Sequence, residues 1–320
     1  MAAPILITGA AGFAGSHLLD LLATEGTPIV AWRRSEGSIP TAATSKVGVT
    51  WQAVDLLDRQ AVRTAIAAVR PSAVYHCAGA AHVGKSWASV TPTLAVNVRG
   101  THHLLDALRE TGTRARVLIP SSALVYATCD RPIAEDAALV PNSPYGLSKL
   151  AQEMLGLRAT RDGLVVTIAR AFNHFGPRQE PFFVASGFAR RIADIEAGRW
   201  QQPELAVGNL EARRDMTDVR DTVRAYHLIL ERGETGRAYN VCSGHAVAVR
   251  ELVDRLLARA RVPVQIRIDP QRYRPNDVPL LAGDPSRIQT ELGWRPHIPL
   301  DQTIDDLLEY WRARARESAT

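Results

Sequence analysis

Short apolar runs alternate with longer stretches of helical periodicity over the first 170 residues of the chain. The strands predicted from the apolar runs are 5–8, 29–32, 49–54, 73–76, 116–120 and 165–170. The helices predicted between them, from apolar positions three and four residues apart, are 15–23, 59–69, 94–110 and 145–160. Strands that alternate with helices of this length indicate a parallel sheet covered by helices on both faces. We therefore expect a doubly wound α/β (Rossmann) fold.

This alternation stops after residue 170. Residues 173–216 are rich in Gly, Pro, Phe and Arg and contain one predicted helix, 186–196. Residues 238–241 have the composition of a strand that returns to the sheet. The helices expected beyond it, on either side of a proline-punctuated stretch, are 249–260 and 300–314.

These patterns predict two interleaved domains. Residues 1–170 plus about 217–243 are expected to bind a dinucleotide. The remainder, about 171–216 plus 244–320, is expected to form a smaller mixed α/β domain that binds the substrate. It should lie at the carboxyl ends of the strands, where doubly wound sheets bind ligands.

Composition places the chain among globular proteins. Hydrophobic residues make up 46% and charged residues 22% of the 320 positions, and no apolar run approaches the roughly 18 residues of a membrane span. The first residues lack the cationic start and cleavage site of a signal peptide, so we expect no membrane association. Three cysteines, Cys77, Cys129 and Cys242, share no metal-ligand spacing. They favour the reducing cytoplasm and predict neither a metal site nor a disulfide framework.

The net charge of +5 and the pI near 9.4 permit binding to polyanions. The basic residues are spread along the chain with acids interleaved, and no cationic arm or nucleic-acid motif is present. The arginines therefore indicate a small anionic ligand rather than a nucleic acid.

A glycine-rich turn, GAAGFAG, follows the first predicted strand and opens the first helix. Glycine lets backbone amides approach a pyrophosphate, and the helix N-terminus adds partial positive charge. A simple tight turn is the alternative, but the strand–turn–helix placement favours a dinucleotide site. The candidate cofactor residues in this turn are Gly9, Gly12, Phe13, Ala14 and Gly15.

The end of the second strand indicates which dinucleotide is bound. Arg33 and Arg34 stand where an NAD-binding chain usually carries an acidic residue for the ribose hydroxyls. Guanidinium groups suit a 2′-phosphate, so NADP(H) is favoured and NAD(H) remains possible. In the alternative, both arginines are solvated and Glu36 reaches the ribose. Asp55 and its neighbour Leu56 are candidates for the adenine, with helix capping as the alternative for Asp55.

Tyr145 and Lys149 form the segment YGLSK at the start of a predicted helix. Their i, i+4 spacing places both side chains on one face, where a nearby ammonium is expected to lower the pKa of the phenol. Ser122, near the end of the fifth strand, completes a candidate catalytic triad by hydrogen bonding to the same reacting oxygen. A Tyr–Lys pair alone is also common on solvated helix faces.

Five segments in the first half resemble extended short-chain dehydrogenase/reductases that act on nucleotide sugars: GAAGFAG, HCAGAAHV, NVRGT, SSALVY and SPYGLSK. Four in the second half resemble the GDP-sugar reductases and dehydratases of that family: RAFNHFGPRQ, VGNLEARRDMTDVRD, YNVCSG and YRPNDVP. The resemblance implies that Ala78 and Ala80 line the cofactor site and that Lys149 also binds the nicotinamide ribose. It further implies a homodimer built on helices 94–110 and 145–160, although burial against the chain's own sheet explains many of their apolar residues equally well.

The same resemblance assigns a nucleotide-sugar site. Asn173, Arg214 and Arg274 are expected to hold the diphosphate, and Asp277 a ribose hydroxyl. The guanine would then lie against Val184, Asn209 and Leu210. For Arg214 the alternative is a surface pair with Arg213, bridged to Asp215 or Asp218.

One departure from the family pattern bears on the reaction. The dehydratases carry an acidic residue two places before the tyrosine of SSALVY, where this chain has Leu124 after Ala123. Because leucine cannot transfer protons, 4-keto reduction or 4-epimerisation is expected rather than loss of water. We expect NADPH-dependent reduction of a GDP-4-keto-6-deoxyhexose. The alternatives are a 4-epimerase with tightly bound NAD and, less favoured, a non-catalytic NADP-binding sensor.

Overall fold

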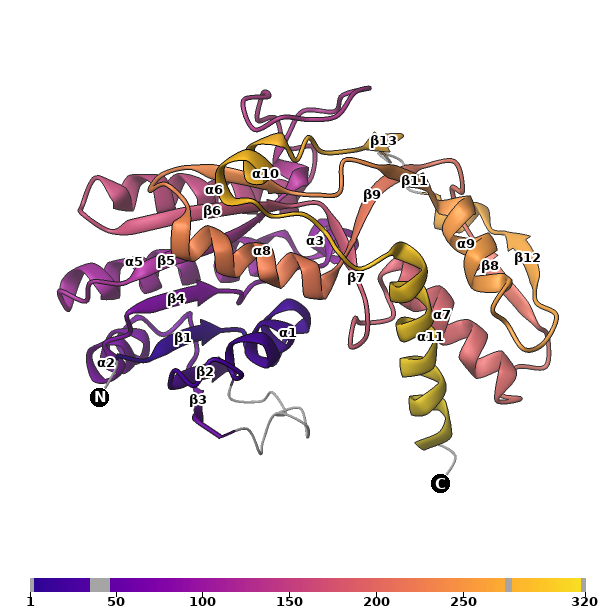
Figure 1. Ribbon diagram of the computed structural model, residues 1–320, viewed down its shortest axis with the longest axis horizontal. Helices are drawn as coiled ribbons and strands as arrows, with labels where there is room; N and C mark the ends of the chain where they lie inside the picture. The colour runs from indigo at the N-terminus through magenta and orange to yellow at the C-terminus, as the bar shows by residue number, and fades with distance from the viewer. Residues whose placement is uncertain (1–2, 35–46, 274–277, 318–320) are drawn as a thin grey trace.

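A computed structural model describes residues 3–34, 47–273 and 278–317. Its centre is a seven-stranded parallel sheet in the order β10-β6-β5-β4-β1-β2-β3 (Figure 1). The strands are β1 (Ile5–Thr8), β2 (Ile29–Arg33), β3 (Val49–Ala53), β4 (Ala73–His76), β5 (Arg116–Ser122), β6 (Val165–Ala171) and β10 (Ala238–Val241). The predicted doubly wound α/β fold is confirmed, including the return of residues 238–241 to the sheet edge.

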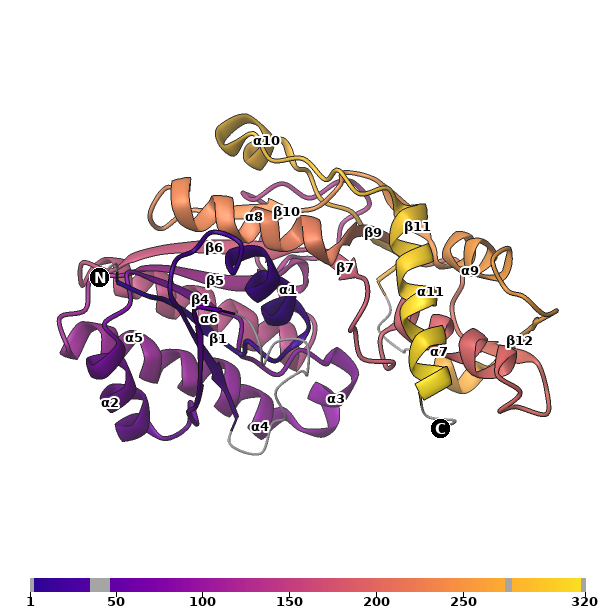
Figure 2. The same cartoon turned by 60° about the horizontal axis from the view of Figure 1, so that its bottom comes forward.

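Both faces of this sheet are covered by helices (Figure 2). Along β1, Ile5 and Ile7 join one apolar core and Leu6 joins the other, because successive side chains point to opposite faces. The helices of the first layer are α1 (Phe13–Leu22), α8 (Val219–Arg232) and α10 (Ser286–Leu292). Those of the second are α2 (Arg59–Val69), α5 (Gly100–Glu110) and α6 (Pro144–Thr160).

The rest of the chain forms a smaller mixed region beside the sheet (Figure 1). Its helices are α7 (Val184–Glu196), α9 (Val249–Leu257) and α11 (Leu300–Glu317). Its strands are β7 (Asn173–Phe175), β8 (Glu204–Val207), β9 (Arg213–Asp218), β11 (Ala246–Ala248), β12 (Gln265–Ile268) and β13 (Leu280–Leu281). They pair as β11-β9-β13 with β7 beside β9, and as β12-β8. A third apolar core between α7, α9 and α11 holds this region together.

The structure departs from the sequence predictions in several elements. The helix expected over 94–110 is instead α4 (Val90–Leu94), a π-helical turn (Ala95–Arg99) and then α5. Helix α8 and the short strands of the smaller region were not predicted, and the helix expected over 249–260 ends at Leu257. A short helix, α3 (Val83–Ala88), also precedes α4.

Candidate active site

The glycine loop lies between β1 and α1. Gly9 has φ +67°, and a Cβ built there would lie 2.6 Å from the Ala78 backbone. At Gly15 a Cβ would lie 2.2 Å from the Gly9 carbonyl oxygen. Helix α1 begins at Phe13 behind Gly12, and among the residues that the structure describes no side chain caps its N-terminus. A close backbone approach and a helix end without a capping side chain fit the pyrophosphate of a dinucleotide.

The two arginines lie at the carboxyl end of β2, next to this loop. Strand β2 runs one residue further than expected, so Arg33 pairs with Ala53 and Arg34 follows it. The Arg33 guanidinium donates to the Arg34 carbonyl at 2.9 Å. Glu36, the residue of the alternative interpretation, lies outside the described residues.

Asp55 and Leu56, the candidate adenine contacts after β3, interact with neighbouring parts of the chain in this structure. Asp55 is exposed, and its Oδ1 accepts from the Leu57 N–H at 2.9 Å. The helix-capping alternative for Asp55 is wrong, because the N-cap of α2 is Asp58, which accepts from the Ala61 N–H. The Leu56 side chain is buried in the core between the sheet and α5. Contact of either residue with adenine remains a prediction.

Asn97 fixes the loop after β4, although sequence reasoning gave it no role. It is completely buried in the π-helical turn, and its Oδ1 accepts from the Ala80 N–H at 2.7 Å. Its Nδ2 donates to the Ala80 carbonyl at 3.2 Å and to Ser148 Oγ of α6 at 2.8 Å. Ala78 and Ala80 are thereby held between the glycine loop and α6. The segment NVRGT was the available sequence signal.

The three candidate catalytic residues come together at the carboxyl end of β5. Ser122 is the last residue of that strand, and Tyr145 lies beside it in the first turn of α6, where Ser122 acts to lower the pKa of the phenol. Lys149 lies one turn further along α6 and is 8% exposed. Its Nζ donates to Gln152 Oε1 at 2.6 Å.

A glycine allows this approach. A Cβ at Gly146 would lie 2.3 Å from the Leu124 carbonyl oxygen, so only glycine lets α6 pack this closely against the turn after β5. The helix begins at Pro144, and the Ser143 hydroxyl accepts from the Gly146 N–H at 3.1 Å. These features, a proline in the first turn and a serine cap, are favourable at a helix start.

Burial sets the protonation of the pair, and here one prediction was wrong. Loss of water raises the pKa of Tyr145 to about 12, partly opposed by the effect of Ser122. Burial also lowers the pKa of Lys149 to about 8, against the opposing charges of Cys77 and Glu153. The ammonium donates to Gln152, and a lowered phenol pKa is not found.

A buried ion pair anchors α6 to the sheet. Glu153 of α6 is completely buried and lies 2.8 Å from the Arg170 guanidinium of β6. Glu153 also accepts from the hydroxyl of Ser121, the neighbour of Ser122, and Arg170 donates to Tyr126 Oη at 2.9 Å. Sequence reasoning missed this pair, although an arginine inside the apolar strand VVTIARA was a usable signal.

A second set of contacts joins α1 to the smaller region. His17 Nε2 and the Pro177 carbonyl are 2.8 Å apart, and Arg178 and Asp20 form an ion pair at 2.6 Å. Burial, together with the charge of Arg178, lowers the pKa of His17 to about 4. A neutral His17 therefore donates from Nε2 and leaves Nδ1 to accept from Arg178, whose Nη2 is 2.6 Å away.

This junction also touches the predicted substrate segment. The rings of Phe13 and His174 stack with centroids 5.8 Å apart. Asn173, which directly precedes His174 at the start of β7, is exposed. The helix that would receive a pyrophosphate is thus packed against the strand that carries Asn173.

The acids beside Arg214 are engaged by other groups. Asp215 accepts from the Ser243 hydroxyl and from backbone amides, and Asp218 is held by Arg220 and Thr303. Arg214 Nη1 instead donates to the Val278 carbonyl at 2.6 Å. These contacts disfavour the alternative interpretation, in which Arg214 bridges to Asp215 or Asp218 at the surface.

The other predicted substrate residues differ in exposure. Val184, the first residue of α7, is 41% exposed, and Asn209 is partly exposed with its Oδ1 accepting from the Glu211 N–H. The Leu210 residue is 3% exposed, its side chain lies within the third core, and its carbonyl accepts from the Arg250 N–H at 2.9 Å. Arg274 and Asp277 lie outside the described residues. Binding by these residues remains a prediction.

Lys85 of α3 is exposed, and its side chain also contacts the smaller region. Its Nζ lies 4.4 Å from the centroid of the Phe182 ring, and the His82 ring lies 5.0 Å from the same ring. Phe182 precedes α7, so helix α3 touches the segment that leads to Val184.

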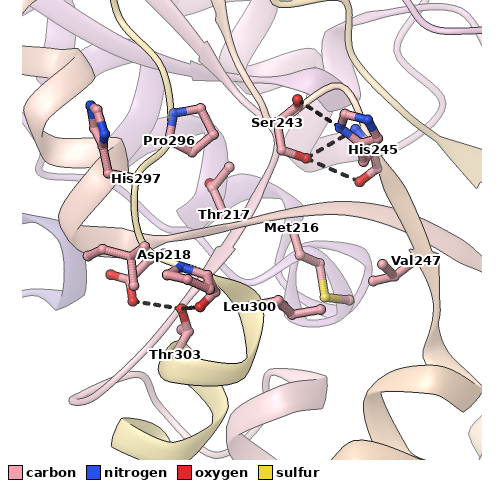
Figure 3. Close-up of a pocket in the computed structure, with 12 residues that line it drawn as sticks. Met216, Thr217, Asp218, Ser243, His245, Val247, Pro296, His297, Leu300 and Thr303 are labelled. Atoms are coloured by element: carbon pink, nitrogen blue, oxygen red, sulfur yellow. Dashed lines mark hydrogen bonds between the residues drawn. The ribbon is translucent and has the colours of Figure 1, made fainter.

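A separate hollow of about 240 Å³ opens between β9 and the start of α11 (Figure 3). Asp218 on its wall accepts from Thr303 at 2.8 Å, and Ser243 interacts with the backbone and ring of His245. None of its lining residues belongs to the predicted site.

In the described part of the chain, no helix is long and apolar enough to span a membrane. Within the same ranges, no three His, Cys, Asp or Glu side chains are grouped so as to hold a metal ion.

Comparisons with known proteins agree with this architecture. Residues 6–307 match the family model described as GDP-mannose 4,6 dehydratase. The chain is 36% identical over 317 residues to GDP-6-deoxy-D-mannose reductase of Pseudomonas aeruginosa, covering 98% of both chains. It is similar to the solved structure of RMD from Pseudomonas aeruginosa complexed with NADPH, with TM-score 0.84, 33% identity and coverage of 98% and 100%. It is also similar to Thermus thermophilus UDP-glucose 4-epimerase in complex with NAD, with TM-score 0.86, 28% identity and coverage of 97% and 99%.

Proposed function

Because the chain belongs to the GDP-mannose 4,6-dehydratase family of extended short-chain dehydrogenase/reductases, we propose that it reduces the 4-keto group of a GDP-4-keto-6-deoxyhexose with NADPH. The observation that carries this proposal is the placement of Tyr145 beside Ser122, with Lys149 one turn along α6. This group lies at the end of the sheet that also carries the glycine loop. The similarity to an NADPH-bound reductase structure supports the choice of cofactor and reaction.

The protonation state of Tyr145 suits reduction. The bound cofactor would supply a hydride to carbon 4 of the sugar. A phenol whose pKa is raised to about 12 is protonated at neutral pH and can give its proton to the developing alkoxide. Ser122 would hydrogen-bond the same oxygen, and solvent would return a proton to Tyr145. Lys149 would bind the nicotinamide ribose and stabilise the transient phenolate.

The surroundings of Ser122 disfavour loss of water. Ala123 is buried and Leu124 partly buried beside it, and neither side chain can accept or give a proton. A dehydratase needs a base or acid at carbons 5 and 6 of the sugar. Reduction at carbon 4 needs only the proton of Tyr145.

The substrate would lie between the sheet and the smaller region. Asn173, Arg214 and Arg274 would neutralise the diphosphate, since a charge-assisted hydrogen bond contributes about 1.5–3 kcal/mol. Asp277 would bind the ribose, and the guanine would meet Val184, Asn209 and the main chain of Leu210. Arg33 and Arg34 at the end of β2 would bind the 2′-phosphate that distinguishes NADP from NAD.

The test is NADPH oxidation with the keto sugar. The wild type should consume NADPH with the sugar present, and Tyr145→Phe should lose at least ~100-fold in kcat with its NADPH affinity retained. Equal turnover by the two proteins, or none by either, would overturn the proposal.

A second candidate, a nucleotide-sugar 4-epimerase, is favoured by the similarity to an NAD-bound epimerase. It predicts copurified NAD and turnover without added cofactor.

The two-part organisation fits these roles. Residues 1–170 with about 217–243 would bind the dinucleotide, and about 171–216 with 244–320 the sugar nucleotide. Within the latter, Ile288, Leu292 and Trp294 return to the sheet core, which would tie the two units together. The unpaired thiols Cys77 and Cys129 suit the reducing cytoplasm that we propose as the location.

A homodimer built on α5 and α6 is part of the proposal. Its surface would include Met154 of α6, which is 46% exposed, together with Leu147 at 52%. Leu105 and Leu108 of α5 are buried in the chain's own core and would not contribute. Sedimentation that gives a monomer at micromolar concentration would exclude the dimer.

A further inference from the structure

Lys149 is hydrogen-bonded to a side chain that no motif singled out, Gln152. The Lys149 ammonium donates to Gln152 Oε1 at 2.6 Å, and Gln152 is 0% exposed. The two residues are three apart on α6, which places them on neighbouring positions of one helix face. An ammonium has only donors, so it needs an acceptor when it is removed from water.

The other end of the same amide is also fixed. Gln152 Nε2 donates to Thr101 Oγ1 of α5 at 2.7 Å. The single hydroxyl proton of Thr101 goes to the Asn97 carbonyl at 2.5 Å, so its oxygen accepts from Gln152. The amide therefore has one allowed orientation, with its carbonyl oxygen facing Lys149.

The chain of bonds continues to the centre of the sheet. Thr101 Oγ1 also lies 2.9 Å from His76 Nε2, which must be the protonated ring nitrogen because the Thr101 proton is already used. His76 Nδ1 then accepts from the Thr8 hydroxyl at 2.8 Å, and Thr8 accepts from the Ala78 N–H at 3.2 Å. The hydrogen bonds therefore converge on Thr101 from two sides, from Thr8 through His76 and from Lys149 through Gln152, and Thr101 donates onward to the Asn97 carbonyl.

We propose that Gln152 is a positioning residue for the reaction, which holds the Lys149 ammonium at the end of this oriented chain before a cofactor binds. The inference rests on the proposed function in one respect, the assignment of Lys149 to the nicotinamide ribose and to Tyr145. An apolar residue at this position would leave the ammonium without this acceptor and Thr101 with His76 as its remaining donor in this network.

The hydrogen bond from Lys149 to Gln152 should raise the pKa of Lys149, against the effect of burial. Among the described residues, the titratable groups that face it are Cys77 and His76 at the end of β4, and Glu153 and Tyr145 on its own helix. Burial lowers the pKa of Lys149 to about 8, and Cys77 and Glu153 act in the opposite direction. An acceptor for the ammonium favours its charged form, so losing the acceptor should lower this pKa further, by about one to two pH units.

The sequence makes this pKa measurable in the protein without cofactor. It contains three lysines, Lys46, Lys85 and Lys149, so ¹³Cε-lysine NMR gives three signals, and Lys149→Met assigns the one required. Gln152→Met, which keeps the volume and removes the acceptor, should move the Lys149 titration to lower pH. Gln152→Glu, which strengthens the acceptor, should move it to higher pH. Ser148→Ala, a buried polar change on the same helix, is the matched control and should leave it in place.

The cofactor provides the second readout. The affinity for NADPH is measured by fluorescence as a function of pH. As the pH rises, this affinity should begin to fall at a lower pH in Gln152→Met than in the wild type. The difference should equal the shift of the Lys149 pKa measured by NMR. A Lys149 titration that is unchanged in both Gln152 variants would overturn the proposal. If Gln152→Met does not fold, the upward shift in Gln152→Glu decides alone. Neither readout requires the sugar, so a protein that fails to reduce any GDP-sugar would refute the proposed function and leave this test intact.

Discussion

The junction between α1 and the smaller region should make the fold sensitive to acid through His17. The pKa of His17 is about 4 in the folded chain, against 6.5 for a fully solvated histidine, because burial and Arg178 disfavour the imidazolium. The unfolded state therefore binds more protons below pH 6.5, and stability falls as the pH falls toward 4. Between pH 7 and pH 5, linkage gives a loss of about 2 kcal/mol from this one group.

The perturbation that isolates this effect is His17→Gln, which keeps a donor for Pro177 and an acceptor for Arg178 but does not titrate. Urea unfolding of both proteins is measured at pH 7 and pH 5. Other groups titrate equally in the two chains, so the wild type should lose about 2 kcal/mol more than the variant on acidification. His17→Asn provides a second non-titrating replacement. If the stability difference between wild type and variant is the same at both pH values, the reasoning about His17 is refuted.

Three further outcomes follow from the site. Gly146→Ala places a Cβ 2.3 Å from the Leu124 carbonyl oxygen, so kcat should fall by at least ~10-fold with the fold retained by circular dichroism, and an unchanged kcat would contradict the close approach. Glu153→Gln leaves the Arg170 guanidinium buried without its counter-charge and should cost about 3–5 kcal/mol in urea unfolding, whereas a loss below about 1 kcal/mol would show that the pair does not anchor α6. Replacing Arg33 and Arg34 together by alanine should weaken NADPH binding by about tenfold or more with NADH binding little changed; equal loss for both cofactors would argue against recognition of the 2′-phosphate.

Much of the sheet and the core of the site could be predicted from the sequence. Strands such as β1 are apolar on both faces, and the Tyr145–Lys149 spacing fixes a common helix face, so local pattern was sufficient. The strand β9 was missed because RRDMTD has no apolar alternation to detect. The sequence of β12, QIRI, does alternate, but four residues are too few to distinguish a strand from a loop.

The polar contacts were beyond local pattern for a different reason. Asn97 acts through a π-helical turn that no spacing rule indicates. Gln152 acts through Thr101 and His76, which are close only after α5, α6 and β4 have packed together. The expectation of a lowered Tyr145 pKa failed because it took account of the neighbouring charge and omitted the loss of water.

The position of β10 has a consequence for the order in which the chain can fold during synthesis. This edge strand pairs with β6, yet it emerges from the ribosome only after α7, β9 and α8 have been made. Until then β6 presents an unpaired edge, and the buried Tyr126 hydroxyl lacks its acceptor, Asn240. A nascent chain that stops before β10 should therefore hold an incomplete sheet prone to association with other strands, and the seven-stranded sheet should reach its final form only once much of the smaller region exists.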